Sequence, residues 1–161
     1  MFNAESIQSR LRQQPFRPLR IVTSSGEAID VTHPDLVLVG ARDIIIGGTG
    51  ADNLTASNFD DLLVAGTTDH DASDAALSLI LAEWRRNDAG YSARLDHLTG
   101  NAGSGLNLTF LLNNQTAHDD NVRDVLRGEN DFDWFLANVV GTGIADRVIA
   151  APGEVTTDID P

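Results

Sequence analysis

The residues of this chain best suited to chemistry are aspartates that recur every nine positions. Asp43, Asp52 and Asp61 follow this spacing, and an aliphatic residue stands two places after each. The middle unit, residues 47–55, has the sequence GGTGADNLT and fits the pattern G-G-x-G-x-D-x-U-x at every specified position. Its glycines allow a turn with positive φ that exposes carbonyl oxygens, and its aspartate closes the turn beside them. Stacked turns of this kind present oxygen ligands at the ~2.3–2.6 Å that calcium prefers.

A second set of aspartates follows later in the chain. Asp124 and Asp133 are again nine apart, and Asp119, Asp120 and Asp131 lie close to them in sequence. Packing these carboxylates together is costly unless a cation or water screens them. A divalent ion is one interpretation of this segment, and solvated loop acids are the other.

Composition narrows the classes of function. The 161 residues carry 24 acidic side chains against 11 arginines, a net charge of −13 that disfavours binding to nucleic acid. Cysteine is absent and the four histidines lack the i, i+4 spacing of a zinc helix. Neither a G-x-S-x-G elbow nor a phosphate-binding loop is present, so we expect no enzyme. No apolar run reaches the ~18 residues of a membrane span, and the N-terminus has no apolar signal region.

The first 40 residues predict a small α/β segment of a helix and a hairpin. A helix is expected over 4–13 and strands over 19–23, 28–31 and 36–39. Charges balance in this segment, whereas the whole net charge of −13 lies in residues 41–161. Residues 1–45, with their QPFRP turn and VTSSGE hairpin, resemble a small bacterial domain of unknown function. Because both the charge and the resemblance change near here, residues 1–42 and 43–161 could also be a fusion of two unrelated pieces.

Two helices are predicted to interrupt the repeats. Apolar residues within 72–86 follow a helical period, and a second short helix is expected over 91–98. Aromatic residues around Trp84 and 132–135 should pack together and dock this insert on the strands. Further predictions are a strand over 106–112, a last strand at 148–149, and a flexible acidic tail over 151–161.

The repeat unit resembles the RTX (haemolysin-type) calcium-binding repeat, which folds as a parallel β-roll. Gly47, Gly48, Gly50, Asp52 and Leu54 carry the resemblance. The order of DLLVAGTT, LSLILAEW, HDD and DWFLA over residues 43–150 resembles a C-terminal module of large extracellular bacterial repeat proteins. The resemblance implies a secreted, extracellular or cell-surface location; the missing signal peptide keeps a cytoplasmic location as the alternative.

We therefore expect a mainly β protein with a helical insert. A short irregular parallel β-roll over 41–150, with its insert at 72–99, follows the α/β segment of residues 1–40. One coil of a β-roll takes two nonapeptides, so the turn 47–52 should stack on 65–70. The predicted calcium ligands are Gly47, Thr49, Asp52, Asp61, Asp69, Asp71, Asp124 and Asp133. The alternative is that these aspartates cap their own turns without metal.

The expected function is that of a non-catalytic, calcium-binding structural or adhesive module. Its partners would be calcium ions and other proteins or cell-surface components, without nucleic acid and without a membrane span. A metal-free protein–protein interaction domain of a cytosolic bacterial protein is the alternative. An enzyme with a carboxylate site is a third hypothesis, and it requires two convergent aspartates in a deep pocket.

Overall fold

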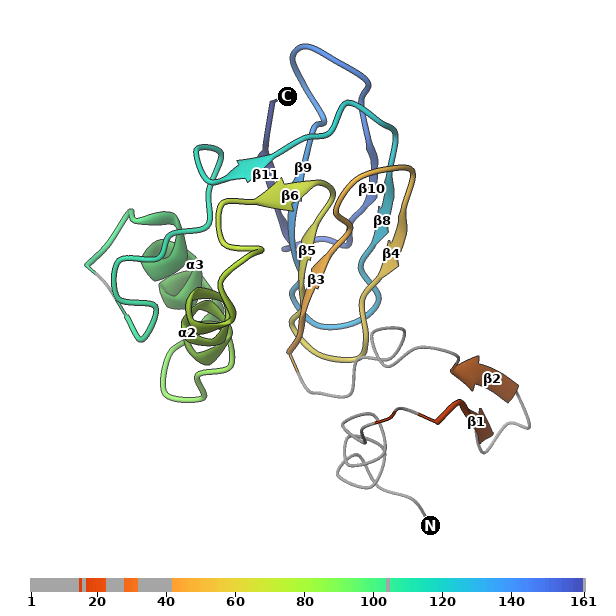
Figure 1. The fold of residues 1–161 in the computed structure, drawn as a ribbon. Helices are drawn as coiled ribbons and strands as arrows, with labels where there is room; N and C mark the ends of the chain where they lie inside the picture. Colours follow the sequence, from red (N-terminus) through yellow and green to blue (C-terminus); the bar gives the residue numbers. More distant parts are fainter. Residues whose placement is uncertain (1–14, 16, 23–27, 32–41, 104, 161) are drawn as a thin grey trace. The chain divides into compact units, whose positions relative to one another are not determined.

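The computed structural model describes residues 15, 17–22, 28–31, 42–103 and 105–160. The chain divides into two compact units, Met1–Gly40 and Ala41–Pro161 (Figure 1). In the first unit, β1 (Leu19–Val22) and β2 (Ala28–Val31) pair antiparallel where the hairpin is expected. The predictions for 4–13, 24–27 and 36–39 lie outside the described residues.

The described part of the second unit contains nine strands and two helices. In chain order these are β3 (Ile44–Ile46), β4 (Asn53–Thr55), β5 (Leu62–Val64), β6 (Thr67–Thr68), α2 (Asp74–Trp84), α3 (Tyr91–Thr99), β7 (Ala117–His118), β8 (Val125–Arg127), β9 (Trp134–Ala137), β10 (Arg147–Ile149) and β11 (Val155–Asp158). The unit is mainly β with a helical insert, as the sequence predicts.

Strands of this unit alternate between two parallel sheets as the chain advances. The four-stranded sheet has the order β11-β9-β5-β3, and the three-stranded sheet has the order β10-β8-β4. Ile44 pairs with Leu62, eighteen residues later, which is the spacing expected for stacked units. Leu54 pairs with Leu126, so the register of the three-stranded sheet continues across the insert.

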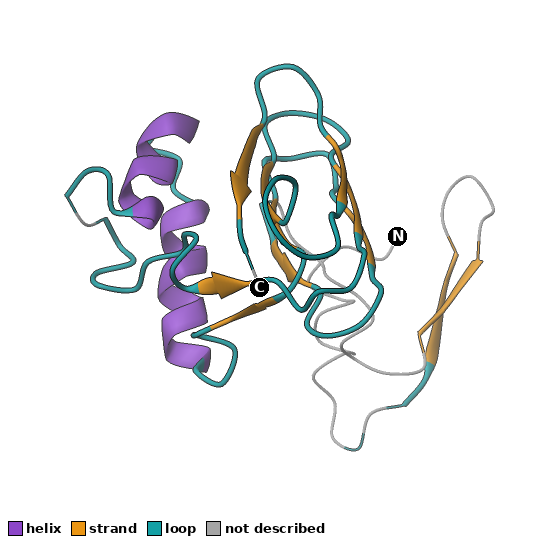
Figure 2. Ribbon diagram, turned by 90° about the horizontal axis from the view of Figure 1, so that it is seen from above, coloured by secondary structure: helices purple, strands orange, loops and turns teal. Residues whose placement is uncertain are grey.

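Two apolar cores cover the two faces of the four-stranded sheet. Leu63 and Phe135 point toward the three-stranded sheet and pack with its Leu54 and Leu126. The opposite face packs against the helices through Leu62, Val64, Trp134, Leu136, Ile80, Trp84 and Leu98. Figure 2 shows both helices on one side of the strands. Double coverage explains why β5 and β9 are apolar and buried at every position, whereas β4 alternates exposed, buried and exposed.

The insert leaves the sheets through a narrow stem. β6 and β7 pair antiparallel, with Thr67 opposite His118, directly after Gly66. A Cβ on Gly66 would overlap the backbone carbonyl of His118, so this close approach requires glycine. Both ends of a 52-residue excursion, Thr67 to His118, therefore meet in a separate two-stranded sheet.

Both helices form near their predicted positions and have recognisable ends. Ser73 caps α2, because its hydroxyl accepts the backbone N–H of Ala76 at 3.3 Å. α3 ends at Gly100, whose φ of 84° is the left-handed conformation that glycine adopts without strain. The Trp84 and Trp134 rings are 5.9 Å apart between centroids, so the aromatic contact expected to dock the insert is present.

Two predictions for the later part of the unit are wrong. No strand forms over 106–112; residues 106–109 form a turn, in which the Asn107 side chain bonds to the backbone carbonyls of His97 and Phe110. Residues 155–158, expected in a flexible tail, form β11 and pair with β9. The Trp134 indole donates to the Thr157 hydroxyl at 2.9 Å, and Ile159 is fully buried, so packing holds this segment in place.

Candidate functional site

Aspartates at the ends of successive turns line up in two columns along the sheets. We define the first column as Asp43, Asp61 and Asp133, and the second column as Asp52, Asp124 and Asp146. In the first column the backbone N–H of each aspartate donates to the carboxylate of the next, at 2.6 and 2.7 Å. The second column repeats this bond at 2.7 and 2.8 Å. The aspartates of each column therefore hold neighbouring turns together, because each backbone N–H bonds to the carboxylate of the next turn.

The glycine turn beside the second column has the predicted local conformation. Gly48 and Gly50 have φ values of 86° and 106°, which glycine adopts freely. The N–H of Gly47 donates to the Val64 carbonyl at 2.9 Å and that of Gly48 to the Gly66 carbonyl at 3.0 Å. The turn is therefore stacked on the residues eighteen positions later, as predicted, as far as Gly66.

Three carboxylate oxygens in and beside the second column are buried without a hydrogen-bond donor in the described part of the chain. They are Asp52 Oδ2, Asp119 Oδ1 and Asp124 Oδ2. Asp124 is fully buried, and Asp119 is 7% exposed. A buried acceptor left unpaired costs ~1–3 kcal/mol, and more when it is charged. These three aspartates, Asp52, Asp119 and Asp124, form what we call the corner. The corner therefore destabilises the fold unless a proton or a cation occupies it.

Neighbouring acids come from two further segments of the chain. Asp120 Oδ2 accepts the Gly50 N–H at 2.5 Å and links the glycine turn to the segment that follows the insert. Asp119 Oδ2 accepts from the Asn138 amide at 3.2 Å, and the backbone N–H of Asn138 donates to Asp146 at 2.9 Å. These contacts bring Asp119, Asp120 and Asp146 to the same corner as the glycine turn.

The acidic side chains of this corner repel one another. Burial, together with the charges of Asp146, Asp120 and Asp52, raises the pKa of Asp124 to about 6. Burial also raises the pKa of Asp146, with Asp119 and Asp120 adding to the effect. Within the described residues, none of the ion pairs involves these five acids. A positive charge at this corner would relieve both the repulsion and the unpaired oxygens.

The donor set determines which ion would suit the corner. All of the side chains are carboxylates, and hard oxygen donors of this type favour calcium or magnesium over zinc. Across the described residues, however, no three histidine or acidic side chains converge closely enough to enclose an ion. Carbonyl oxygens of the glycine turn and water would have to complete a coordination shell around a metal.

The remaining predicted ligands have other roles. Thr49 is exposed in the glycine turn. Asp69 accepts from the His118 imidazole at 2.8 Å, and Asp71 accepts from the hydroxyl and N–H of Thr68 at 2.6 and 3.0 Å. The predicted stacking of 47–52 on 65–70 fails beyond Gly66, because the chain turns there into the insert stem. Asp124 occupies the place beside Asp52 that the sequence assigned to residue 70.

The first column is largely satisfied by protein groups. Asp43 forms an ion pair with Arg85, and Asp61 accepts the Ser57 N–H at 2.6 Å. At its end, burial together with the adjacent Glu154 carboxylate raises the pKa of Asp133 to about 7. Of the predicted ligands in this column, Asp61 is hydrogen-bonded through both oxygens and Asp133 shares its environment with a second acid.

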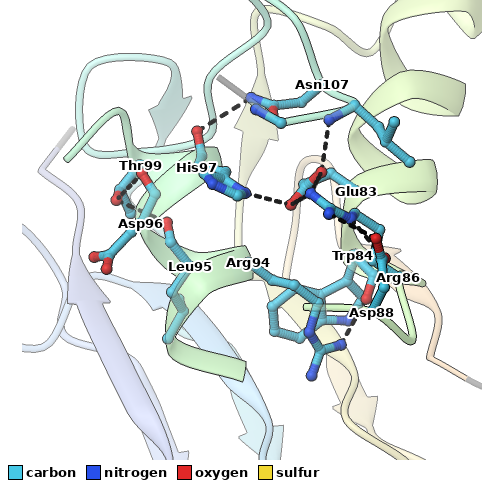
Figure 3. Close-up of polar contacts among 12 residues, drawn as sticks. Glu83, Trp84, Arg86, Asp88, Arg94, Leu95, Asp96, His97, Thr99 and Asn107 are labelled. Carbon is cyan, nitrogen blue, oxygen red and sulfur yellow. Dashed lines mark hydrogen bonds and ion pairs between the residues drawn. The ribbon is translucent and has the colours of Figure 1, made fainter. Parts of the chain in front are cut away.

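A separate buried polar cluster holds the insert together (Figure 3). Glu83 is fully buried on α2 and accepts from His97 Nδ1 at 2.6 Å and from the Leu106 N–H at 2.6 Å. Burial opposes its ionisation, but the bonds from His97, Leu106 and Arg86 outweigh this and lower the pKa of Glu83. The cluster ties α2, α3 and the turn at 105–110 to one another, which is a structural role.

Comparison with family models, curated proteins and solved structures finds no match to this chain. Neither α2 nor α3 has the length or hydropathy that crossing a bilayer requires, and the same holds throughout the described residues.

The sequence predicts only part of this corner. Asp52 and Asp124 are among the predicted ligands, whereas the sequence marks Asp119 and Asp120 only as neighbours of the second set of aspartates. Asp146 is not among the predicted ligands, because it follows Asp124 by 22 residues instead of a multiple of nine. Its detectable signal is Val148, an inward aliphatic residue two places later, as in the regular units.

Proposed function

We propose that residues 41–161 form a calcium-stabilised β-roll of RTX type with a structural or adhesive, non-catalytic role. The observation that carries this proposal is the set of three buried, unpaired carboxylate oxygens of Asp52, Asp119 and Asp124. They lie beside a glycine turn and belong to an alternating two-sheet topology, which supports the β-roll assignment.

Calcium fits this corner on chemical grounds. It accepts six to eight oxygen ligands in flexible geometry, so carboxylates from several turns can serve together with carbonyls and water. Ligands from Asp52 precede the insert in the chain, whereas Asp119 and Asp124 follow it. A bound ion would therefore fix the relative positions of distant segments, and metal affinity would appear as folding free energy.

Calorimetric titration of the full chain with calcium, after treatment with a chelator, tests the proposal. We expect binding together with a rise in melting temperature of ~5–10 °C when calcium is about one hundredfold above its Kd. Asp124→Asn and Asp119→Asn should each abolish binding or weaken it at least tenfold. Asp96→Asn, the same change at an exposed position on α3, serves as the control and should bind like the wild type.

The same experiment evaluates the metal-free alternative. The first column supports that alternative, because its carboxylates are bonded to backbone N–H groups and to Arg85 without a metal. Identical melting curves in millimolar calcium and in chelator would remove the calcium role. The chain would then be better described as a metal-free interaction domain whose aspartates cap their own turns.

A further inference from the structure

The outer face of the three-stranded sheet differs from the rest of this acidic unit. β4 and β8 alternate between exposed and buried positions, and Leu54, Leu126 and Val148 of the sheet point into the core. The other side chains form an outer face, which consists of Asn53, Thr55, Val125, Arg127, Arg147 and Ile149. The helices cover the four-stranded sheet instead, so within the described part of the second unit no helix covers this face.

Two arginines on the outer face stand apart from the other cations. Residues 42–161 contain seven arginines, and four of them form ion pairs with acids. Arg123 donates to the Ala145 carbonyl at 3.0 Å. Arg127 and Arg147 are exposed, and neither side chain has an ion pair or hydrogen bond with any residue that the structure describes.

Acids are excluded from the same face. Residues 41–161 contain 20 acidic side chains, yet none occupies the six positions of the outer face. Arg127 pairs with Ile149, and Arg147 pairs with Val125, so the arginines lie diagonally on neighbouring strands. Strand spacing and rise place their Cα atoms about 8 Å apart. Two guanidinium groups are therefore available on a face whose own six positions carry no carboxylate.

We propose that the outer face binds an acidic polysaccharide of the uronate type. Guanidinium groups pair with carboxylates in a two-pronged geometry, which accounts for the arginines. Val125 and Ile149 offer an aliphatic surface for the C–H faces of sugar rings, and Asn53 and Thr55 offer groups that bond to hydroxyls. A nucleic acid fits less well, because its higher charge density is repelled by a chain of net charge −13.

The surface is small, so binding is weak and sensitive to salt. Three short strands accommodate about two sugar residues, and exposed charge pairs contribute ~0.2–1 kcal/mol each. None of the carboxylates assigned to calcium lies on the outer face, so the polysaccharide proposal stands or fails separately from the calcium proposal.

NMR titration of the full chain with a hyaluronan hexasaccharide, in calcium and again in chelator, tests the assignment. We expect shifts confined to β4, β8 and β10, and no binding of the same hexasaccharide with its carboxyls reduced to alcohols. The double variant Arg127→Gln, Arg147→Gln should lose at least fivefold in affinity. Arg123→Gln, which removes an exposed arginine outside the sheet, should bind like the wild type.

Several outcomes would overturn the assignment. Absence of binding at millimolar hexasaccharide, or equal affinity in the double variant, would remove the polysaccharide as the occupant. Tighter binding of a thymidine hexanucleotide or of a short polyaspartate would assign the face to a nucleic acid or an acidic protein instead. Melting curves of the variants confirm that each one is folded before its affinity is compared.

Discussion

Without metal, the free energy of unfolding should fall as the pH rises from about 4 to about 7. Burial raises the pKa of Asp124 to about 6 and that of Asp133 to about 7, and neighbouring acids contribute to both. In the unfolded chain an aspartate has a pKa of about 3.9. The folded protein therefore binds more protons than the unfolded chain between these values. This stabilisation is complete below about pH 4 and is lost as the pH rises through about 6 to 7.

The expected loss of unfolding free energy follows from the difference in pKa between the folded and unfolded states at Asp124 and Asp133. About two pKa units at Asp124 and about three at Asp133 are worth at most ~7 kcal/mol. Local relaxation and water reduce the cost of a buried charge, so we expect about half of that, ~3 kcal/mol. For a chain of this length, such a loss lowers the melting temperature by ~6–12 °C.

Urea unfolding at a series of pH values in chelator measures this dependence. The double variant Asp124→Asn, Asp133→Asn should flatten the curve and exceed the wild type in stability at about pH 8, because it removes two buried charges. Asp96→Asn, at an exposed position, should leave the curve unchanged. Wild-type stability that is independent of pH, or that increases toward pH 8 in chelator, would refute the reasoning. Added calcium should reverse the slope, because protons and metal compete for the same oxygens.

Three further predictions concern the insert. Gly66→Ala should destabilise the protein by ~1–3 kcal/mol in urea unfolding, because the new Cβ overlaps the His118 carbonyl, whereas Gly103→Ala, which meets open space, should be nearly neutral. Glu83→Gln should cost ~2 kcal/mol and weaken the near-UV circular dichroism of the tryptophans, because a buried carboxylate loses its charged hydrogen bonds. Leu108→Gly should raise the melting temperature, because Leu108 is 56% exposed and has a φ of 54°, a conformation that costs ~1–2 kcal/mol for a residue with a side chain. A lower melting temperature for this glycine variant would show that Leu108 is not strained.

Short-range patterns predicted the repeat strands and both helices. The strands after Asp43, Asp52 and Asp61 form where the inward aliphatic residues indicate, and α2 and α3 follow their helical period. These features depend on side-chain periodicity within one element, which a single sequence displays directly.

Long-range features were not predicted, because they depend on contacts between distant segments. The 106–112 segment alternates apolar and polar residues like a strand, but Asn107 bonds to two backbone carbonyls and imposes turns. Nothing local indicates that Gly66 begins a stem, since its requirement arises from the His118 carbonyl. Residues 155–158 belong to the acidic stretch 151–161 that predicts a loose tail, yet an edge of β9 is available to them.

The aspartate columns depend on strand register and not on counting nine residues. Asp52 and Asp124 are 72 residues apart, a multiple of nine, whereas Asp124 and Asp146 are 22 apart, which is not. Both pairs nevertheless make the same bond from backbone N–H to carboxylate, at 2.7 and 2.8 Å. Two places after each of these aspartates lies an inward aliphatic residue, and these residues are level with one another across the sheet. The chain can therefore lengthen a turn, or open it into a whole helical insert, without disturbing a column, provided that the aspartate and its aliphatic partner remain two residues apart.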